Sequence, residues 1–479
     1  MKSNDPDQDT MTILYIGDER IFHQDYYGME ATYWIFLPLV RNVGDERGEI
    51  IPVLAESWSH SDDYRTWTVK LREDIFWHDG VKMTAEDVKF SIDLKNSEAF
   101  QKIECELIDE FTFTITTEKP KTSLPTWEVY YPKHLLEHLD PKEYYSWDFW
   151  SNPVGNGPYK FVRSMPKTMV EVTVNPLYFG EKPKIKNARL KFSQNASLQE
   201  LLSGNVDALT YVKREMLIKI KGDDRFNSYH WWGGWLESLI WNHNNPLFEE
   251  TKVRQALTQG VNRVELAEVL FYPEGVPITE VMSTRRQRLK NDLPPGLPYD
   301  PNEATKLLNE CGWYDTNNNG ILDRDGVEFQ FEVIVNEQNK LMATYIQNNY
   351  KEIGISMKIQ TIENNIIRER FREKAFDVIL TRFDNSFNFR WIREYFGEDS
   401  KIGYQNKEMD SIINLIENTG NIEEIDRLAK ELHPIFQKDL PITFILPQVQ
   451  THIVRSNVKG LNNLYRTDPV WFLEYLWFE

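Results

Sequence analysis

The spacing in this chain that most resembles a catalytic motif is His134-Leu-Leu-Glu137-His138, an H-x-x-E-H sequence. Two histidines four residues apart share one face of a helix, as two ligands of one Zn²⁺ ion must. The pattern therefore raises a zinc peptidase as one alternative function. No third ligand follows at a characteristic spacing, and an ordinary helix start is the interpretation we favour.

A second polar segment, from residue 315 to residue 326, has the composition of a calcium loop. Oxygen-bearing side chains occupy loop positions 1, 3, 5 and 9, and glycine occupies position 6. These four residues are Asp315, Asn317, Asn319 and Asp323. Position 12, where a bidentate glutamate belongs, is Gly326. Two interpretations stay open: a weak structural calcium site, and a polar hairpin ahead of a strand that starts at Phe329.

Nucleophilic catalysis has no support in the sequence. There is no G-x-S-x-G, P-loop or dinucleotide-binding glycine pattern. Cys105 and Cys311 are the two cysteines, too few for a disulfide framework. Cys311 falls on one predicted helical face with Ala304, Leu307 and Leu308, so we expect it to be a buried apolar residue. The sequence predicts neither an enzyme nor a cofactor.

The composition is that of a large globular protein. At roughly 100–200 residues per domain, 479 residues predict two to four domains. The net charge of −19 opposes direct binding to nucleic acid or to an anionic membrane. No stretch approaches the roughly 18 apolar residues of a membrane-spanning helix, and no signal peptide is visible.

Strand and helix patterns alternate along most of the chain. Trp67, Val69 and Leu71 fall on one face of a half-buried strand, and Thr84 opens a helix. A single long amphipathic helix is predicted over 252–271. Further on, we expect strands at 329–335, 355–359, 377–380 and 442–446, and helices at 340–353, 407–417 and 423–437. This alternation indicates a mixed α/β domain.

Six blocks of sequence occur in an order that is informative, although each block alone is weak evidence of a family. They are Ala55-x-x-Trp58 with Phe76-Trp-His-Asp-Gly80 and Thr84-Ala-Glu-Asp-Val-Lys-Phe-Ser91; Pro153-Val-Gly-Asn-Gly-Pro-Tyr159; Asn175-Pro-x-Tyr178 with Leu202-Ser-Gly204; Trp241-Asn242 with Val253-Arg-Gln-Ala-Leu257; Gly312-Trp313-x-Asp315; and Val458-Lys-Gly460. From about residue 12 to its end, the chain resembles the family-5 extracellular solute-binding proteins of ABC importers, the oligopeptide- and dipeptide-binding group.

The resemblance implies an α/β, two-lobed, hinged fold of the periplasmic-binding-protein type II-like class, with an additional third domain (cluster C-like). Lobe I would be discontinuous, comprising 12–44, 160–237 and 442–479. Residues 45–159 would form the family-specific domain, and 238–441 would form lobe II. The resemblance also implies a monomeric lipoprotein in the periplasm or on the outer face of the cell membrane. It would capture its ligand by hinge closure and deliver it to a permease driven by an ATPase.

The resemblance further implies where the ligand binds. In peptide binders of the family, a tryptophan and then an aspartate follow the strand corresponding to 377–380, and the aspartate pairs with the peptide's free amino group. Asp384 stands at about this place, although the family's Trp-x-x-Asp-Tyr-x-x-Pro pattern is not kept. Around it, and in the N-terminal segment that the family places along its cleft, we expect ligand contacts from Asp384, Arg382, Phe383, Asn385 and Trp391, and from His23, Tyr26 and Tyr27.

An oligosaccharide is the alternative ligand. Some members of the family bind oligosaccharides and stack the sugar rings on tryptophan. The cluster Trp231-Trp-Gly-Gly-Trp235 would suit such a ligand, and Trp235 is therefore added to the candidate contacts. The same tryptophans would equally suit core packing, so the sequence leaves the two ligand classes open.

Overall fold

A computed structural model describes residues 9–16, 32–42, 50–96, 103–124, 128–165, 168–193, 197–270, 296–384, 389–461 and 473–479. The chain forms two compact units. Unit 1 comprises residues 1–231 and 450–479, and unit 2 comprises residues 232–449. Unit 2 is thus one continuous segment inserted into unit 1, and each unit is described by itself below.

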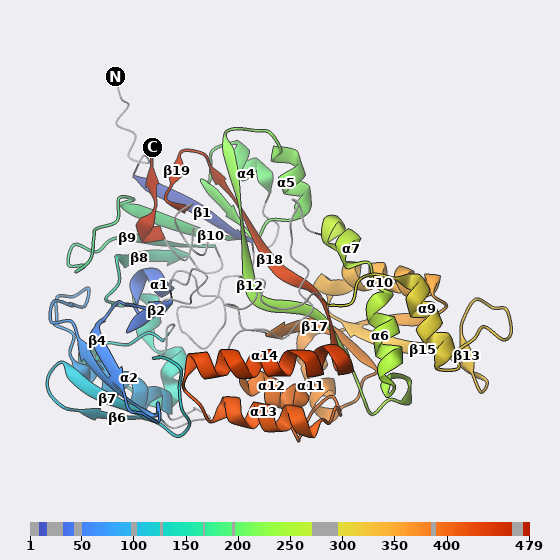
Figure 1. The fold of residues 1–479 in the computed structure, drawn as a ribbon. Helices are drawn as coiled ribbons and strands as arrows, with labels where there is room; N and C mark the ends of the chain where they lie inside the picture. Colours follow the sequence, from blue (N-terminus) through green and yellow to red (C-terminus); the bar gives the residue numbers. More distant parts are fainter. Residues whose placement is uncertain are drawn as a thin grey trace. The chain divides into compact units, whose positions relative to one another are not determined.

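The main sheet of unit 1 is built around β1, which runs parallel to both of its neighbours. Its strands are β1 (Thr10–Ile16), β10 (Asn187–Ser193), β11 (Ala208–Thr210), β9 (Met169–Val174), β8 (Tyr159–Met165) and the C-terminal part of β18 (Ile442–Arg455). Strands β9 and β8 extend the sheet antiparallel on one side, and β18 pairs antiparallel with β11 on the other. Figure 1 shows β1 and β10 side by side.

Unit 1 also contains a smaller antiparallel sheet with the strand order β4-β5-β7-β6. These strands are β4 (Ala55–His60), β5 (Thr66–Leu71), β7 (Thr112–Thr117) and β6 (Ile103–Leu107), and α2 (Ala85–Asn96) belongs to the same region. Trp67, Val69 and Leu71 are buried, which confirms the predicted face of this strand. The backbone amide of Thr84 donates to Asp87 Oδ2 at 2.9 Å and caps α2, as the sequence predicts.

The two sheets of unit 1 contribute to one hydrophobic core. Met11 and Ile13 of β1 belong to the same buried cluster as Val69 and Phe113 of the smaller sheet. The separate domain that we expect over 45–159 therefore shares its core with the rest of unit 1. The division into three domains stays a prediction.

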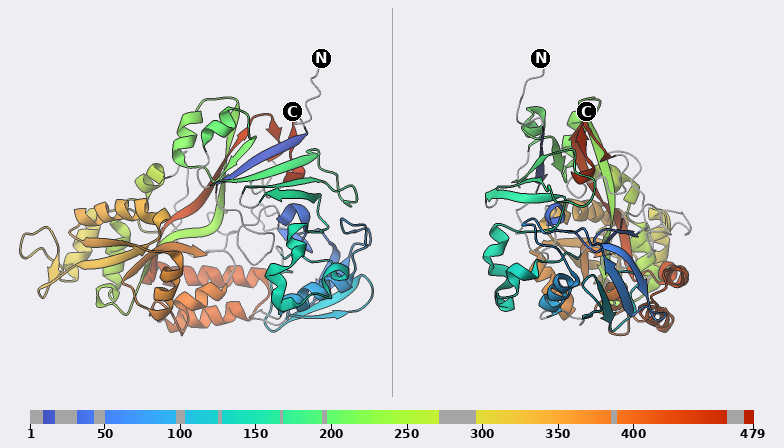
Figure 2. Two further views of the ribbon diagram at one scale, coloured as in Figure 1. Left: turned by 180° about the vertical axis from the view of Figure 1, so that it is seen from behind. Right: turned by 90° about the vertical axis from the view of Figure 1, so that its left-hand side faces the viewer.

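Unit 2 has a sheet covered by helices on both faces (Figures 1 and 2). Strands β15 (Gln330–Val335), β16 (Ser356–Thr361) and β17 (Val378–Asp384) are parallel, and β12 (Phe226–Trp241) pairs antiparallel with β17. Alternation along β12 places Leu239 and Trp241 in one core, with α6 (Thr251–Gln259), α9 (Pro301–Glu310) and α10 (Lys340–Glu352). It places Leu236 and Ile240 in another core, with α11 (Asn364–Glu373), α12 (Phe389–Phe396), α13 (Lys407–Glu417) and α14 (Ile422–Asp439).

The single long helix predicted over 252–271 is wrong. The structure has two helices, α6 (Thr251–Gln259) and α7 (Arg263–Leu270). Gly260 caps the first, and a Cβ there would lie 2.7 Å from the side chain of Ile353. Asn262 starts the second by accepting the backbone amide of Glu265 on its side chain at 3.2 Å. The apolar period continues across this break, which is why periodicity alone did not show it.

Both chain connections between the two units are β-strands. The chain leaves unit 1 within β12, between Trp231 and Trp232, and returns within β18, between Val449 and Gln450. In the part of the chain that the structure describes, no helix has the length and apolarity needed to cross a membrane.

Candidate functional site: the carboxyl edges of two sheets

In each unit, three parallel strands end together at one edge of the sheet. In unit 1 these strands are β1, β10 and β11, and in unit 2 they are β15, β16 and β17. In open α/β sheets, ligands bind outside the carboxyl ends of such strands, where loops leave room and backbone groups are unpaired. The side chains at these two edges are therefore the candidate ligand contacts.

At the carboxyl edge of unit 2, four polar side chains form a connected network. We name Glu237, Gln338, Asn339 and Arg382 the polar edge. Arg382 Nε donates to Glu237 Oε1 at 3.2 Å, and Arg382 Nη2 donates to Gln338 Oε1 at 3.2 Å. Asn339 Nδ2 donates to Glu237 Oε2 at 2.9 Å. Strands β12 and β17 place Glu237 directly opposite Arg382, while η4 (Glu337–Asn339), which follows β15, supplies the two amides.

The two charges of the polar edge differ sharply in exposure. The side chain of Glu237 is 5% exposed and that of Arg382 is 43% exposed. Burial raises the pKa of Glu237, while the charge of Arg382 and the hydrogen bonds from Asn339 and Arg382 act in the opposite direction. The buried carboxylate of Glu237 therefore contacts one side of the guanidinium group, and the rest of the Arg382 side chain is exposed to solvent.

At the carboxyl edge of unit 1, the side chains are aromatic. We name Tyr15, Phe192, Tyr211 and His452 the aromatic edge. The ring of Tyr15 meets Phe192 with centroids 6.0 Å apart and meets Tyr211 at 4.9 Å, and both pairs are edge-to-face. Tyr211 also packs edge-to-face on His452 at 5.5 Å. Tyr15, Phe192 and Tyr211 are half-buried, whereas His452 is fully buried behind them. Such rings offer flat apolar area with hydroxyl groups at their rim.

Tyr211 has a backbone conformation that points to a special position. Its φ is +58°, in the left-handed region that bulky side chains rarely adopt. Backbone pairing on both sides of Tyr211 maintains this strained conformation. Strand β11 precedes Tyr211, and the backbone amide of Val212 donates to Thr451 O at 3.0 Å. Strained residues of this kind cluster at ligand sites, because only the surrounding structure can hold them in place.

The structure locates only part of the predicted ligand set. Asp384 is the last residue of β17, and its backbone is paired with that of Trp235. Trp391 lies in α12. The side chains of Asp384, Trp235 and Trp391 lie outside the description, as do residues His23, Tyr26, Tyr27 and Asn385 entirely. Of the predicted contacts, Arg382 alone has a described side chain that reaches solvent.

Phe383 is a correction to the predicted set. Its side chain is 1% exposed and packs in the core of unit 2 against Tyr395, Phe396 and Phe444, with ring centroids 5.1 to 5.8 Å apart. Successive side chains of a strand point to opposite faces, so Arg382 and Phe383 cannot both line the same surface. Phe383 therefore anchors β17 and is not a ligand contact.

The H-x-x-E-H sequence does not form the helical face that zinc binding needs. Helix α3 (Lys133–Leu136) ends before Glu137 and His138 are reached. His134 Nε2 lies 2.8 Å from Asp79 Oδ2, in a contact that ties this segment to the loop before α2. Within the described ranges there is no group of three or more His, Cys, Asp and Glu side chains that could hold a metal.

The calcium-loop segment forms a tight polar turn followed by a hairpin. Asp315 accepts the backbone amides of Asn319 and Gly320 at 3.1 and 2.9 Å, and Asp323 accepts the amide of Thr316 at 2.9 Å. Strands β13 (Asp323–Arg324) and β14 (Val327–Glu328) then pair across the turn at Asp325 and Gly326. This confirms the predicted hairpin, and the calcium interpretation of Asp315, Asn317, Asn319 and Asp323 stays a prediction.

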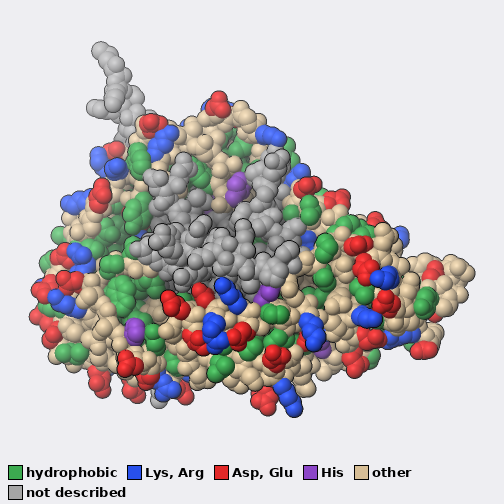
Figure 3. All heavy atoms as spheres, viewed as in Figure 1, with side chains coloured by type: hydrophobic (Ala, Val, Ile, Leu, Met, Phe, Trp, Pro, Cys, Tyr) green, Lys and Arg blue, Asp and Glu red, His purple; other side chains and the backbone are tan. Residues whose placement is uncertain are grey.

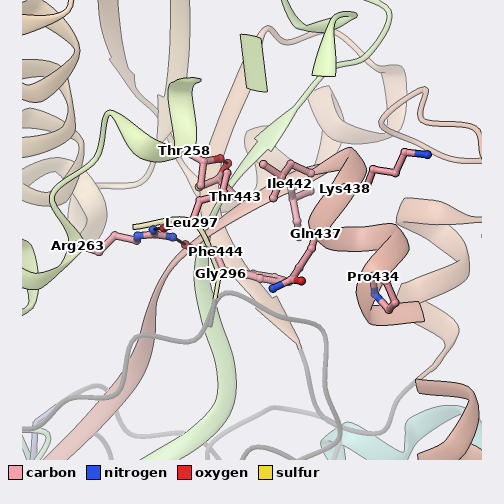
Figure 4. A pocket seen from close by; sticks show the side chains of 11 residues that line it. Thr258, Arg263, Gly296, Leu297, Pro434, Gln437, Lys438, Ile442, Thr443 and Phe444 are labelled. Atoms are coloured by element: carbon pink, nitrogen blue, oxygen red, sulfur yellow. Dashed lines mark hydrogen bonds between the residues drawn. The ribbon is translucent and has the colours of Figure 1, made fainter. Parts of the chain in front are cut away.

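Unit 2 also contains a pocket of about 390 Å³ (Figure 4). Its lining includes Thr258 and Thr443, whose hydroxyls lie 2.6 Å apart, and Arg263, which donates to the carbonyl oxygens of Leu297 and Phe444. Thr443 contacts Trp241, which is paired with the first residue of β17. The pocket thus lies near the amino ends of the strands and contains no residue of the polar edge.

The surface charge of the described residues is mixed. Figure 3 shows Asp and Glu side chains interspersed with Lys and Arg side chains on the face in view. The excess of acidic residues in the sequence is therefore not concentrated there into a single patch that would dictate a cationic ligand. Ligand chemistry must instead be inferred from particular side chains.

The mixed α/β fold and the side chains at the carboxyl ends of its strands are compatible with ligand binding, and comparison with known proteins identifies the class of protein. The chain belongs to the bacterial extracellular solute-binding proteins, family 5, whose sequence model matches residues 49–390. The predicted resemblance and fold class are thereby confirmed, and the family is one of binding proteins. Its members act outside the cytoplasm, as the family description states.

Individual relatives sharpen this assignment. The chain is 26% identical to the oligopeptide-binding protein AppA of Bacillus subtilis, over 95% of this chain and 90% of that protein. It is 25% identical to the di/tripeptide-binding protein 1 of Pseudomonas aeruginosa, over 88% and 86%. Among solved structures, a putative peptide-binding protein AppA from Clostridium difficile has a TM-score of 0.82 at 21% identity, covering 98% of this chain and 100% of that one.

Sequence reasoning missed most of the residues now placed at the two edges. Glu237 was detectable, since it is a single carboxylate in the otherwise apolar strand segment Leu236-Glu-Ser-Leu-Ile-Trp241. Asn339 gave no signal, because it joins Glu237 only through a fold that brings residues 102 positions apart into contact. Tyr15 and Tyr211 gave none either, since an isolated tyrosine is as common in cores as in sites.

Proposed function

We propose that this chain is the substrate-binding component of an ABC importer and captures a peptide. The observation that carries the proposal is its similarity to an oligopeptide-binding protein over 95% of the chain. In this proposal Asp384, at the carboxyl end of β17, pairs with the free amino group of the peptide. A buried ammonium group needs such a charged partner, since its desolvation is otherwise strongly unfavourable.

The edge of each unit offers a different kind of contact to a peptide. The half-buried rings of the aromatic edge supply apolar area for peptide side chains. The polar edge supplies hydrogen bonds of fixed direction. Ligand capture is by hinge closure, as the family relationship implies, and it is driven by the higher affinity of the ligand for the closed form.

The remaining assignments follow from the same proposal. The chain acts as a monomer without catalysis, in the periplasm or anchored as a lipoprotein on the outer face of the cell membrane. It delivers the peptide to a permease coupled to an ATPase. Relatives described as putative ABC transporter peptide-binding proteins from Brucella species, 30% identical over 58% of this chain, support this partnership.

Binding of free and N-acetylated peptides, measured by calorimetry, tests the proposal. We expect the free-amine peptide to bind, and we expect Asp384→Asn to weaken that binding by about tenfold or more, since a charge-assisted contact contributes about 1.5–3 kcal/mol. The same substitution should not change the weaker binding of the acetylated peptide. Asp325→Asn, in the exposed β13–β14 turn, is a matched control that should leave both unchanged.

Binding of oligosaccharides and no peptides would overturn the proposal in favour of the alternative ligand class. In that case Trp235→Ala should abolish binding, because stacking on an indole ring is the main contact expected for a sugar. Hydrolysis of the peptide during the measurement would contradict the non-catalytic role.

A further inference from the structure

Two asparagine–glycine pairs occur in the sequence, Asn156-Gly157 and Asn319-Gly320. In such a pair the backbone nitrogen of the glycine can attack the side-chain amide of the asparagine, because glycine has no Cβ to obstruct the approach. Neither pair takes part in the function proposed above. The structure places the two pairs in opposite surroundings, which predicts opposite reactivity.

The first pair is enclosed in the core of unit 1. Asn156 is 1% exposed, and its side-chain oxygen accepts the backbone amide of Leu37 at 2.9 Å. Gly157 N donates to Ile35 O at 2.7 Å, and a Cβ on Gly157 would lie 2.5 Å from Trp34 O. The backbone there has no room to move, and the acceptor of the Gly157 proton is a neutral carbonyl. The pair is therefore unreactive unless this part of unit 1 opens.

The second pair lies in the polar turn before β13, where both of its residues are exposed. No described atom lies within 4 Å of the place where a Cβ on Gly320 would stand. The amide of Gly320 donates to Asp315 Oδ2 at 2.9 Å, so a carboxylate is in position to take up the proton of the attacking nitrogen. The amide of Ile321 donates to Asn319 Oδ1 at 2.8 Å, on the oxygen where negative charge develops during the attack.

We propose that Asn319 is a site of spontaneous modification in the folded protein. The nitrogen of Gly320 forms a bond to Cγ of Asn319, and its proton passes to the carboxylate of Asp315. The bond from Cγ to Nδ2 then breaks, and the NH₂ group leaves with that proton as ammonia. The product is a cyclic imide. Water adds to either carbonyl group of the imide and opens the ring, which leaves an aspartate or an isoaspartate at position 319.

The modification changes the contact between this turn and the hairpin that follows it. Asn319 Nδ2 donates to Glu328 Oε1 at 2.8 Å and so ties the turn to β14. A carboxylate at position 319 replaces this hydrogen bond with repulsion between like charges. An isoaspartate also inserts one methylene group into the backbone. Both products therefore loosen the turn from the hairpin.

Ageing of the full-length protein tests the proposal. The protein is incubated near pH 8, either folded or in guanidinium chloride, and peptide mapping then measures the loss of each asparagine and separates aspartate from isoaspartate. Asn319 should react no more slowly in the folded protein than in denaturant. Asn156 should react about a hundredfold more slowly when folded, because it must wait for the core to open.

Two results would overturn the proposal. One is a slower loss of Asn319 in the folded protein than in denaturant, which would mean that the turn protects the pair. The other is a product that is aspartate alone, since direct hydrolysis of the side chain gives no isoaspartate and does not involve the nitrogen of Gly320.

Asp315→Asn tests the role of the carboxylate. The variant keeps an oxygen for the Gly320 amide but cannot take up the proton, so hydroxide must remove it. The loss of Asn319 in the folded variant should therefore rise about tenfold per pH unit between pH 6 and 8, and the wild-type loss should rise less steeply. A turn that is merely loosened does not produce this difference, and equal pH profiles would show that Asp315 is not the proton acceptor.

Glu328→Gln is the matched control. Asp323 and Glu328 are the other carboxylates that accept hydrogen bonds in the described part of this loop, and neither accepts the Gly320 amide. The substitution changes the partner of the Asn319 side chain and leaves the attacking nitrogen with Asp315. It should keep the wild-type pH profile, and a profile like that of Asp315→Asn would contradict the assigned proton transfer.

Discussion

The carboxyl edges of units 1 and 2 are both formed by three parallel strands, yet they carry different side chains. The aromatic edge of unit 1 consists of rings packed edge-to-face around Tyr211, with a buried histidine behind them. The polar edge of unit 2 consists of an arginine held by a buried glutamate and two amides. Similar strand ends can thus carry either aromatic rings, which offer apolar contact area, or polar side chains, which offer hydrogen bonds of fixed direction.

This difference matters for specificity. Apolar contact discriminates weakly between ligands of similar size, whereas a hydrogen-bonding site strongly rejects a ligand that lacks the matching group. A protein that accepts many peptide sequences needs broad contact area for side chains and strict recognition of the groups that all peptides share. We expect the aromatic edge to provide the first and the polar edge to provide the second.

The largest expected effect comes from removing one partner of the ion pair in the polar edge. Arg382→Met leaves Glu237 buried without its cation, which should lower the free energy of unfolding by about 2 kcal/mol at pH 8, less than for a fully buried pair because Arg382 is half-exposed. Urea denaturation would measure it. Adding Glu237→Gln should restore most of the loss.

The pH dependence of this variant follows from the raised pKa of Glu237. An acid whose pKa is raised on folding contributes stability that is complete below its unfolded pKa of about 4.3 and is lost as pH rises through the folded pKa. Removing Arg382 raises the folded pKa further, so the deficit should be small near pH 4 and full at pH 8. A deficit that does not change with pH would show that Glu237 is not its cause.

The next largest effect should come from the aromatic edge. Tyr211→Ala removes ring contact with Tyr15 and His452, and we expect peptide affinity to fall about tenfold through lost apolar area. Free-acid and amide peptides should lose affinity equally. Calorimetry with matched acid and amide pairs measures both losses. A loss confined to the acid would contradict the division of roles between the two edges.

The strained backbone of Tyr211 allows a smaller but cleaner test. At φ +58° glycine is unstrained, while alanine is not. Tyr211→Gly should therefore be about 1 kcal/mol more stable than Tyr211→Ala, the reverse of the usual order within a strand. Thermal unfolding of the two variants decides it. Equal stabilities would mean that the backbone relaxes once the ring is removed.

The smallest expected effect is that of salt. Any contribution of the polar edge to peptide binding involves a half-exposed cation, so that contribution should weaken about twofold between 50 and 500 mM NaCl as screening increases. The affinity lost in Tyr211→Ala should not change with salt, because that contact is apolar. Repeating the binding measurements at both salt concentrations compares the two edges directly.

Much of the fold was predictable because local patterns and tertiary structure agree. Trp67, Val69 and Leu71 alternate in sequence and are buried together, and β15, α10, β16 and β17 all lie near their predicted positions. The break at Gly260 was not predictable from periodicity, since the apolar period continues across it, and the close approach of the Ile353 side chain to Gly260 is a tertiary contact. The residues of the edges depend on contacts across long separations, such as the 145 positions between Glu237 and Arg382.

Phe383 shows the limit of reasoning from position in a motif. The resemblance gives Asp384 as the expected partner of the peptide's amino group, and Phe383 is one of the residues around it that we expect to contact the ligand. Alternation along a strand argues for the opposite conclusion, because residues at odd and even positions face different sides. The same rule does not identify Glu237 as the partner of Arg382. That pairing depends on the antiparallel register between β12 and β17, which only the structure shows.

The insertion of unit 2 into unit 1 sets the order in which the protein can be completed during synthesis. Unit 2 is entirely translated by residue 449, whereas β11 of unit 1, which pairs with β1 on one side, still lacks β18 on the other. Val454, Val458, Leu461, Leu473 and Leu476 of the unit 1 core all come later still. Unit 1, whose N-terminal segment is synthesised first, is therefore the unit that is completed last. Until its final thirty residues are made, unit 1 leaves one side of β11 without a partner strand, and an unpaired strand edge of this kind favours aggregation.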